Sequence, residues 1–184
     1  MSLIVGLGNP GAKYSKNRHN AGFMAIDLLL NELKPHDITK KDFKGELYRH
    51  GSIYFLKPHT FMNLSGESVQ TVKNYFKIEN VIVIHDEIEL AIGALRFKFG
   101  GGHAGHNGLK SIDSHIGSDY FRIRIGIGKP VDKKDVADYC LSDFKSGELE
   151  NMKESFKNAC NGAIELAKGT ELSQVCSNFT INIK

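Results

Sequence analysis

Short apolar runs bounded by turn residues predict the strands of a sheet. Residues 3–5 are Leu-Ile-Val and stop at Gly6, and residues 81–84 are four consecutive β-branched residues. Buried strands of parallel sheets read as continuous apolar runs because both of their faces are covered. Further strands are predicted around Leu47, at residues 53–56 after a turn at Gly51-Ser52, at residues 94–99 and at residues 123–127.

Apolar residues at helical spacing predict helices between these strands. In residues 20–33 the spacing is carried by Phe23, Ile26, Leu29, Leu30 and Leu33. Asn20 is a candidate N-cap of this helix, and Pro35 ends the pattern. Shorter helices are predicted at residues 69–76 and after Asn107, and a long amphipathic helix at residues 147–168.

Strands that alternate with helices are typical of an α/β fold. We expect a single domain over residues 1–184, with three α/β/α layers around a twisted, mixed and largely parallel sheet. Asn9 lies just past the first strand, and Asp86 lies at the end of the strand at residues 81–84. Ligands of open α/β sheets bind beyond the carboxyl ends of the strands, so both side chains are expected at one crevice.

Composition limits the class of protein. The 184 residues are 41% hydrophobic and 24% charged, which is ordinary for a globular protein, and no apolar run is long enough to span a membrane. The first residues lack the layout of a secretory signal peptide. Cys140, Cys160 and Cys176 are too widely spaced for a disulfide framework or a metal knuckle. We expect a cytoplasmic protein, without membrane association, whose thiols are buried or inert.

Charge is distributed unevenly along the chain, although the net charge is only +3. Residues 96–134 hold eight basic residues against three acidic ones, a net +5, while the remainder carries −2. A locally basic segment favours a polyanion as partner, and a solvated surface face is the alternative.

A glycine motif follows the first strand. Residues 6–11 match G-x-G-x-x-G, a pattern of dinucleotide-binding proteins. Pro10-Gly11 and the residues after it do not start a helix, and the second strand with an acidic end is missing. We therefore disfavour a nucleotide cofactor and favour a tight turn that presents the Asn9 side chain.

His19 and Asp86 are candidates for acid–base chemistry. A lone histidine is often structural, and Asp86 is alternatively a turn residue at a strand end. Their expected meeting at one crevice favours a dyad, because a carboxylate fixes the imidazole tautomer and raises its basicity. The sequence has no G-x-S-x-G nucleophile elbow. His19 is therefore expected to activate water directly as a general base.

Two further segments have open interpretations. Residues 100–108 are rich in glycine, which permits positive φ angles, close approach of a ligand or an anion nest. His103 and His106 in this loop have no cysteine or carboxylate at ligand spacing, so a metal is not expected. Asn63 is either a helix cap or a site residue.

Together these motifs resemble bacterial peptidyl-tRNA hydrolase. The resemblance spans the chain and is carried, in order and spacing, by residues 6–11, Tyr14, 18–22, 61–66, 86–87, 100–109 and 121–128. It implies a monomeric, metal-free and cofactor-free cytoplasmic esterase. Such an enzyme cleaves the ester between a peptide and the terminal ribose of tRNA, and so recycles tRNA from prematurely released peptidyl-tRNA.

The same resemblance implies roles for individual residues. His19 corresponds to the general base, Asp86 to the carboxylate that holds it, and Asn9 to the residue that separates peptidyl-tRNA from free aminoacyl-tRNA. Positions that contact the tRNA acceptor end or the peptide are Tyr14, Phe61, Asn63 and Asn107, and positions that contact phosphates are Arg96, Lys98 and Arg124. The residues after Pro130 resemble a mobile lid.

Two other function classes stay open at the level of sequence. A catalytically silent RNA-binding module would share the basic segment, but the His19 and Asp86 pair argues against it. A nucleotide-dependent oxidoreductase would share only the glycine motif. Asparagine amides suit the esterase best, since they donate hydrogen bonds to an oxyanion or a peptide backbone without competing for the proton.

Overall fold

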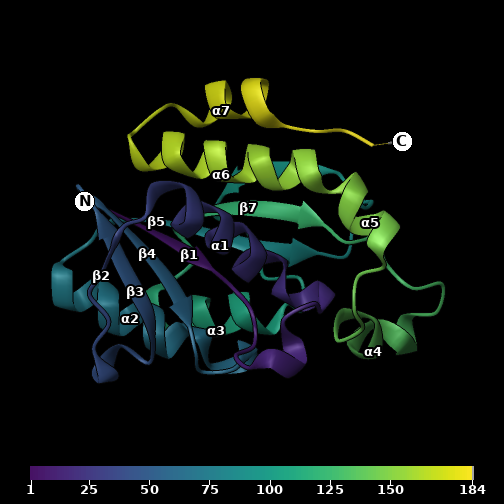
Figure 1. Cartoon of the computed structure of the whole chain (residues 1–184), viewed down its shortest axis with the longest axis horizontal. Coiled ribbons are helices and arrows are strands. Elements are labelled where there is room, and N and C mark those ends of the chain that lie inside the picture. Colours follow the sequence, from purple (N-terminus) through teal and green to yellow (C-terminus); the bar gives the residue numbers. More distant parts are fainter. Residues whose placement is uncertain (184) are drawn as a thin grey trace.

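A seven-stranded sheet forms the centre of the computed structural model, which describes residues 1–183 (Figure 1). The strand order is β2-β3-β4-β1-β5-β7-β6. The central strands β4, β1, β5 and β7 are mutually parallel, while the pairs β2–β3, β3–β4 and β6–β7 are antiparallel. The strands are β1 Ser2–Gly6, β2 His36–Asp37, β3 Gly45–His50, β4 Ile53–Pro58, β5 Asn80–Glu87, β6 Leu95–Phe99 and β7 Phe121–Gly126.

Helices cover both faces of this sheet. Figure 1 shows α6 and α7 on one side, together with α1, and α2 and α3 on the other. The α-helices are α1 Ala21–Leu33, α2 Ser65–Phe76, α3 Asn107–Ile116, α4 Val136–Cys140, α5 Ser146–Asn151, α6 Lys153–Ala167 and α7 Leu172–Phe179. Short 3-10 helices are η1 Ala12–Tyr14, η2 Arg18–Asn20, η3 Lys41–Phe43, η4 Met62–Leu64 and η5 Lys133–Asp135. The predicted α/β/α fold with a mixed, largely parallel sheet is confirmed.

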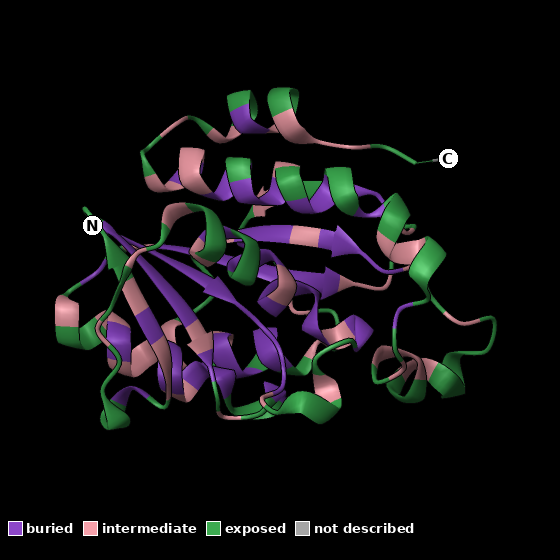
Figure 2. Cartoon of the chain, in the orientation of Figure 1, coloured by how far each residue is buried: buried purple, intermediate pink, exposed green. Residues whose placement is uncertain are grey.

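Alternating side chains of the strands build two cores. On β1, Ile4 belongs to the core beneath α1 and α6, while Leu3 and Val5 belong to the core beneath α2 and α3. All three are fully buried, because a central parallel strand is covered on both faces. Figure 2 shows this arrangement as buried strands between helices whose outer surfaces are exposed.

The prediction of one continuous helix over residues 147–168 is wrong. The structure divides it into α5 and α6 at Met152, and a capping interaction between Lys145 and Glu148 starts α5 at Ser146. Met152 is fully buried, so the apolar pattern runs through the break without interruption. Among the strands and α-helices of residues 1–183, β2, α4 and α7 were not predicted, and neither were the short 3-10 helices.

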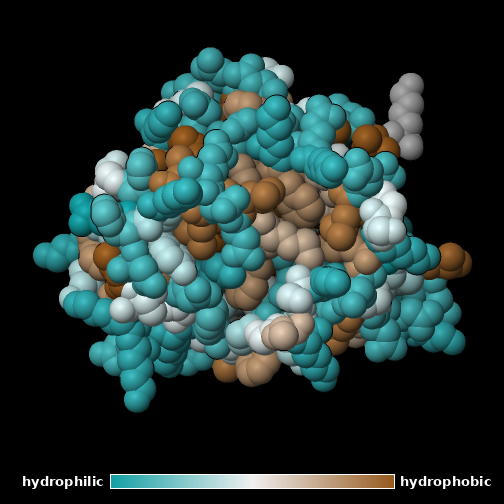
Figure 3. Space-filling model, viewed as in Figure 1, coloured by the Kyte–Doolittle hydropathy of each residue, from teal (hydrophilic) through white to brown (hydrophobic). Residues whose placement is uncertain are grey.

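Among residues 1–183, no helix has the length and apolar character required to cross a membrane. On the face drawn in Figure 3, hydrophobic side chains gather toward the middle and hydrophilic ones surround them.

Candidate active site

A cleft of about 760 Å³ opens beyond the carboxyl ends of β1 and β5. These neighbouring strands are parallel, with Gly6 opposite Ile84, so their ends reach the same edge of the sheet. Of the predicted site residues, seven line the cleft, namely Asn9, His19, Asn63, Asp86, Lys98, Asn107 and Arg124. The sequence argument for one shared crevice is thus confirmed in its geometry.

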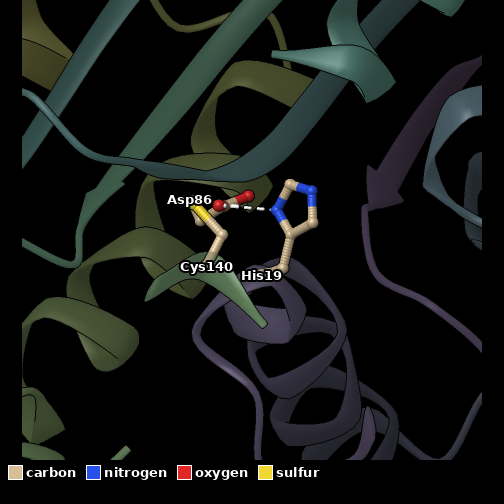
Figure 4. Close-up of side chains that lie close together, drawn as sticks. All are labelled: His19, Asp86 and Cys140. Carbon is tan, nitrogen blue, oxygen red and sulfur yellow. Dashed lines mark hydrogen bonds and ion pairs between the residues drawn. The ribbon is translucent and has the colours of Figure 1, made fainter. Parts of the chain in front are cut away.

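His19 and Asp86 are directly hydrogen bonded at the floor of this cleft. The Nδ1 of His19 lies 2.7 Å from Oδ2 of Asp86. Figure 4 marks this hydrogen bond with a dashed line. His19 comes from η2, just before α1, and the first turn of α1 packs tightly on the sheet because Gly22 has no side chain. A β-carbon at Gly22 would clash with the backbone of Leu7 and Ile84. Close approach of α1 therefore brings His19 to the end of β5.

His106 occupies the other oxygen of the same carboxylate. Its Nε2 lies 2.7 Å from Oδ1 of Asp86. Its Nδ1 accepts the backbone N–H groups of Gly108 and Leu109 and so caps the N-terminus of α3. Since Nδ1 is an acceptor, the ring proton sits on Nε2 and is donated to Asp86. Asp86 thus accepts from two imidazoles, and sequence reasoning missed the second one.

The electrostatics of the three groups follow from this arrangement. Burial alone would raise the pKa of Asp86, but the charges and hydrogen bonds of His19 and His106 hold it well below its usual range. Burial acts in the opposite direction on His19 and lowers its pKa, yet the Asp86 charge and hydrogen bond outweigh burial. The net effect raises the His19 pKa above 6.5. The ionised form of Asp86 is therefore favoured, and its charge increases the basicity of His19.

His85 lies behind this group and differs from its neighbours. It is almost completely buried, and its Nδ1 donates to the carbonyl oxygen of Asp86 over 2.8 Å. Burial lowers the pKa of His85 to about 3, so it is neutral. The ring supports the end of β5 rather than taking part in proton transfer.

Asn9 is held by a reciprocal pair of hydrogen bonds. The side chain of Asn20 accepts the backbone N–H of Asn9 and donates to its carbonyl oxygen. The Oδ1 of Asn9 accepts the N–H of Met62, which fixes the orientation of the amide. Within residues 1–183, the Nδ2 of Asn9 has no partner, so Asn9 offers a donor to the cleft.

The hydrogen bonds between Asn9 and Asn20, here called the Asn9–Asn20 clamp, bear on two predictions: the capping role of Asn20 and the interpretation of the glycine motif. Asn20 stands at the N-cap position of α1 but makes no side-chain capping bond, so its predicted capping role is wrong. The glycine motif at residues 6–11 leads into the clamped turn, and α1 begins only at Ala21. A dinucleotide-binding motif would instead open the helix.

Other predicted residues lie at the rim or outside the cleft. Asn63 and Asn107 are exposed at the rim, and α2 begins at Ser65 without a capping bond from Asn63. Tyr14 and Phe61 do not line the cleft but pair edge to face, with ring centroids 6.3 Å apart. Phe61 is 51% exposed and has a φ of 63°, a strained conformation for a bulky residue.

The three predicted phosphate-contacting residues lie on the neighbouring strands β6 and β7. Arg96 and Arg124 are paired across β6 and β7, and Lys98 shares their face, although exposed Arg96 does not line the cleft. Burial and then the charge of Arg124 lower the pKa of Lys98. Arg124 Nε donates to Glu87 over 3.0 Å, which leaves its terminal nitrogens for another ligand. This cluster is suited to an anion.

Arg122 has a structural role, although it belongs to the basic segment of the sequence. It is fully buried and donates to the carbonyl oxygens of Gly101 and Gly102, and it pairs with Asp113. The glycine-rich loop, in which Gly100, Gly101 and Gly105 adopt positive φ, is therefore anchored by Arg122.

The short helix α4 borders the cleft, and Lys133 and Lys134 just before it also line the cleft. Cys140 and Leu141 line the cleft at the end of this helix. The segment is attached to the residues just before His19, because Arg18 donates to Ser142 and its guanidinium lies over the rings of Tyr139 and Phe144. Burial, and then the charge of Asp86, raise the pKa of Cys140 to about 12, so its thiol is protonated.

Within the described residues, one group has the side chains required for a metal ion. It consists of His19, Asp86 and Cys140, and one ligand atom from each lies within 4.8 Å of the others. His103 and His106, the pair considered from the sequence, do not form such a group.

Comparison with known proteins establishes the family. The family model for peptidyl-tRNA hydrolase matches residues 3–184. The chain belongs to the peptidyl-tRNA hydrolase family. A peptidyl-tRNA hydrolase from Sulfurovum sp. is 55% identical over 169 residues, covering 89% of each chain. One from Aliarcobacter butzleri is 50% identical over 183 residues, covering 98% of this chain and 100% of the relative.

A solved structure agrees with this assignment. The crystal structure of peptidyl-tRNA hydrolase from Acinetobacter baumannii is 36% identical and superposes with a TM-score of 0.92. The match covers 99% of this chain and 95% of the other. The peptidyl-tRNA hydrolase resemblance drawn from the sequence motifs is therefore confirmed for both family and fold.

Proposed function

We propose that this chain is an esterase that hydrolyses peptidyl-tRNA to free peptide and tRNA. Its family membership supports the substrate, and the observation that carries the chemistry is the His19–Asp86 hydrogen bond at the floor of the cleft. No observation favours the alternative of a catalytically silent RNA-binding module. The reaction recycles tRNA from prematurely released peptidyl-tRNA, which assigns the protein to the cytoplasm, where it acts as a monomer.

His19 acts as general base in this proposal. Its Nδ1–H donates to Asp86, which leaves the Nε2 lone pair to take a proton from water. The resulting hydroxide forms a bond to the ester carbonyl carbon, and the carbonyl electrons move to the oxygen. When this intermediate collapses, the bond to the ribose oxygen breaks and His19 returns the proton to that oxygen. Asp86 stabilises the imidazolium throughout, and no metal or cofactor takes part.

Asn9, Asn63 and Asn107 supply neutral hydrogen-bonding groups around the ester. The free Nδ2 of Asn9 donates to the carbonyl of the peptide bond that blocks the amino group. Asn63 and Asn107 at the rim, together with Tyr14 and Phe61 beside it, contact the acceptor end or the adjacent peptide. Lys98 and Arg124, with Arg96 next to them, bind phosphates and carry no base preference.

The decisive experiment measures release of free tRNA from an N-blocked aminoacyl-tRNA, with the unblocked aminoacyl-tRNA as control. We expect turnover of the blocked substrate and slow or no turnover of the unblocked one. Binding of tRNA without turnover of either substrate would instead identify an RNA-binding module.

Asn9→Asp is expected to narrow the difference in kcat/KM between blocked and unblocked substrates by about tenfold to a hundredfold. The carboxylate still accepts the Met62 N–H, but it has no hydrogen to donate to the substrate carbonyl. The measurement compares kcat/KM on both substrates for the wild type and the variant. An equal loss on both would assign Asn9 to positioning of water.

Lys98→Ala and Arg124→Ala are expected to raise KM for full-length peptidyl-tRNA and leave kcat nearly unchanged. Phosphate contacts are equally strong in the ground and transition states, so their loss affects binding alone. Each variant should also reduce the log–log salt slope by about 0.7–0.9. The measurement is a salt series with full-length substrate.

The controls for these variants are a short substrate and a distant lysine. A blocked amino acid on a short 3′-terminal oligonucleotide should be hydrolysed equally by all variants if it does not reach these side chains. Lys157→Ala removes an exposed positive charge on α6, across the sheet, and should change neither KM nor the salt slope. Equal impairment on short and long substrates would exclude a phosphate clamp.

A further inference from the structure

The thiol of Cys140 lies beside the catalytic pair, at a position that hydrolysis as proposed above does not use. One nitrogen of His19, one carboxylate oxygen of Asp86 and Sγ of Cys140 lie within 4.8 Å of one another. Figure 4 shows the sulfur next to the carboxylate, with the His19 ring on the other side of the carboxylate in this view. The three residues come from η2, β5 and the end of α4, so the fold brings together ligand atoms from distant parts of the chain.

These donor types form the ligand set of a thiophilic divalent cation. Imidazole nitrogen, carboxylate oxygen and thiolate sulfur are the three ligands that Zn²⁺ binds in proteins, at about 2.0–2.3 Å. Such bond lengths require donor separations of about 3.2–3.8 Å in a tetrahedral site. The present separations run from 2.7 Å between His19 and Asp86 to at most 4.8 Å, so side-chain shifts of about 1 Å complete the site.

The local charge favours a cation. Asp86 is an anion with 1% of its side chain exposed, and the hydrogen bond from His106 stays on its other oxygen, Oδ1. Oδ2 therefore remains available to a metal while the carboxylate is held in place. With three protein ligands, the fourth position stays open toward the cleft, as in zinc sites that bind water or an exchangeable ligand.

We propose that His19, Asp86 and Cys140 form an inhibitory Zn²⁺ site within the active centre. The metal binds Nδ1 of His19, so the ring proton moves from Nδ1 to Nε2 and the imidazole stays neutral. The thiol loses its proton to solvent as the Zn–S bond forms, and no oxidation or reduction takes place. With a hydrogen on Nε2, His19 has no lone pair to accept a proton from water, and hydrolysis stops.

The inhibition rests on the proposed hydrolase function, whereas the metal site does not. The first measurement is therefore spectroscopic and uses Co²⁺ as the probe. Titration of the reduced protein with Co²⁺ should produce a thiolate-to-cobalt charge-transfer band with one equivalent bound, and Zn²⁺ should abolish the band. Cys140→Val and Cys140→Ser should lack it, while Cys176→Ala, which removes another half-buried thiol, should retain it.

The second measurement is inhibition by Zn²⁺, expressed for each variant relative to its own rate without metal. Cys140→Val and Cys140→Ser should need at least about tenfold more Zn²⁺ for half-inhibition than the wild type, because the site loses one of three ligands. Cys176→Ala should resemble the wild type.

The outcomes separate the two proposals. Absence of the band in the wild type, or its persistence without the Cys140 thiol, would overturn the metal site. A band without inhibition by Zn²⁺ would overturn its inhibitory role. A Cys140-dependent band in a protein that hydrolyses no peptidyl-tRNA even without metal would support the site while rejecting the hydrolase function.

Discussion

His19→Ala is expected to lower kcat by about 10²–10⁴, the usual contribution of a positioned general base. The substitution removes the imidazole that Asp86 holds by Nδ1 and whose Nε2 lone pair is available to water at the cleft. The Nε2 of His106 is engaged as a donor to Asp86, and His85 is buried behind the strand end. Single-turnover hydrolysis of N-blocked aminoacyl-tRNA measures the effect directly.

Controls distinguish loss of the base from loss of structure. Asp86 keeps its hydrogen bond from His106 in the variant, so the end of β5 should stay folded and tRNA affinity should be unchanged. His59→Ala removes an exposed histidine that pairs with Glu46 outside the cleft, and it should retain the wild-type rate. Retention of more than about a tenth of kcat by His19→Ala would assign the base to another group.

The fold was largely predictable because its elements have strong periodic patterns. The apolar runs of β1 and β5 and the helical spacing in α1 identify elements that are buried against the sheet. The break at Met152 was not predictable, since half-buried Leu149, buried Met152 and buried Phe156 continue one apolar face across it. Helix α7 was not predicted because it has only eight residues, although four of them do follow helical spacing and pack against the core, namely Leu172, Val175, Cys176 and Phe179.

The sequence could predict only those site residues whose positions are determined by the ends of the strands. Asn9 follows β1 and Asp86 lies near the end of β5, and these strands are parallel neighbours, so their shared position at one cleft follows from topology. The roles of His106, Asn20 and Cys140 depend on loop conformation and on the path of α4, which no short-range pattern encodes. His106 caps α3 with a ring nitrogen rather than with one of the side chains usual at an N-cap, so the sequence offered no capping signal.

Asp86→Asn is expected to lower kcat by about 10⁴, because the amide imposes the wrong tautomer on His19. The carboxylate accepts from two N–H donors, whereas an amide has one accepting oxygen and one donating nitrogen. The Nε2–H of His106 is fixed as a donor by the capping bonds at Nδ1, so the amide oxygen must turn toward His106. The amide NH₂ then faces Nδ1 of His19, which moves the ring proton to Nε2 and removes the base.

A second substitution distinguishes a wrong His19 tautomer from loss of the Asp86 charge as the cause of the lower kcat. His106→Asn keeps a capping oxygen for α3 but is too short to donate to position 86. In the Asp86→Asn/His106→Asn double variant the amide oxygen is free to accept from His19, so kcat should recover at least about tenfold over Asp86→Asn alone. No recovery would mean that the tautomer is not the cause.

The pH–rate profile independently measures the effect of the Asp86 carboxylate on the pKa of His19. Hydrolysis needs neutral His19, so in the wild type the rate rises with pH through the raised pKa of His19. Without the Asp86 charge, burial remains as the main influence and lowers that pKa, so the rising limb in the double variant should shift to lower pH. A rising limb at the wild-type position would show that Asp86 does not set the basicity of His19, and its role would then be limited to holding the end of β5.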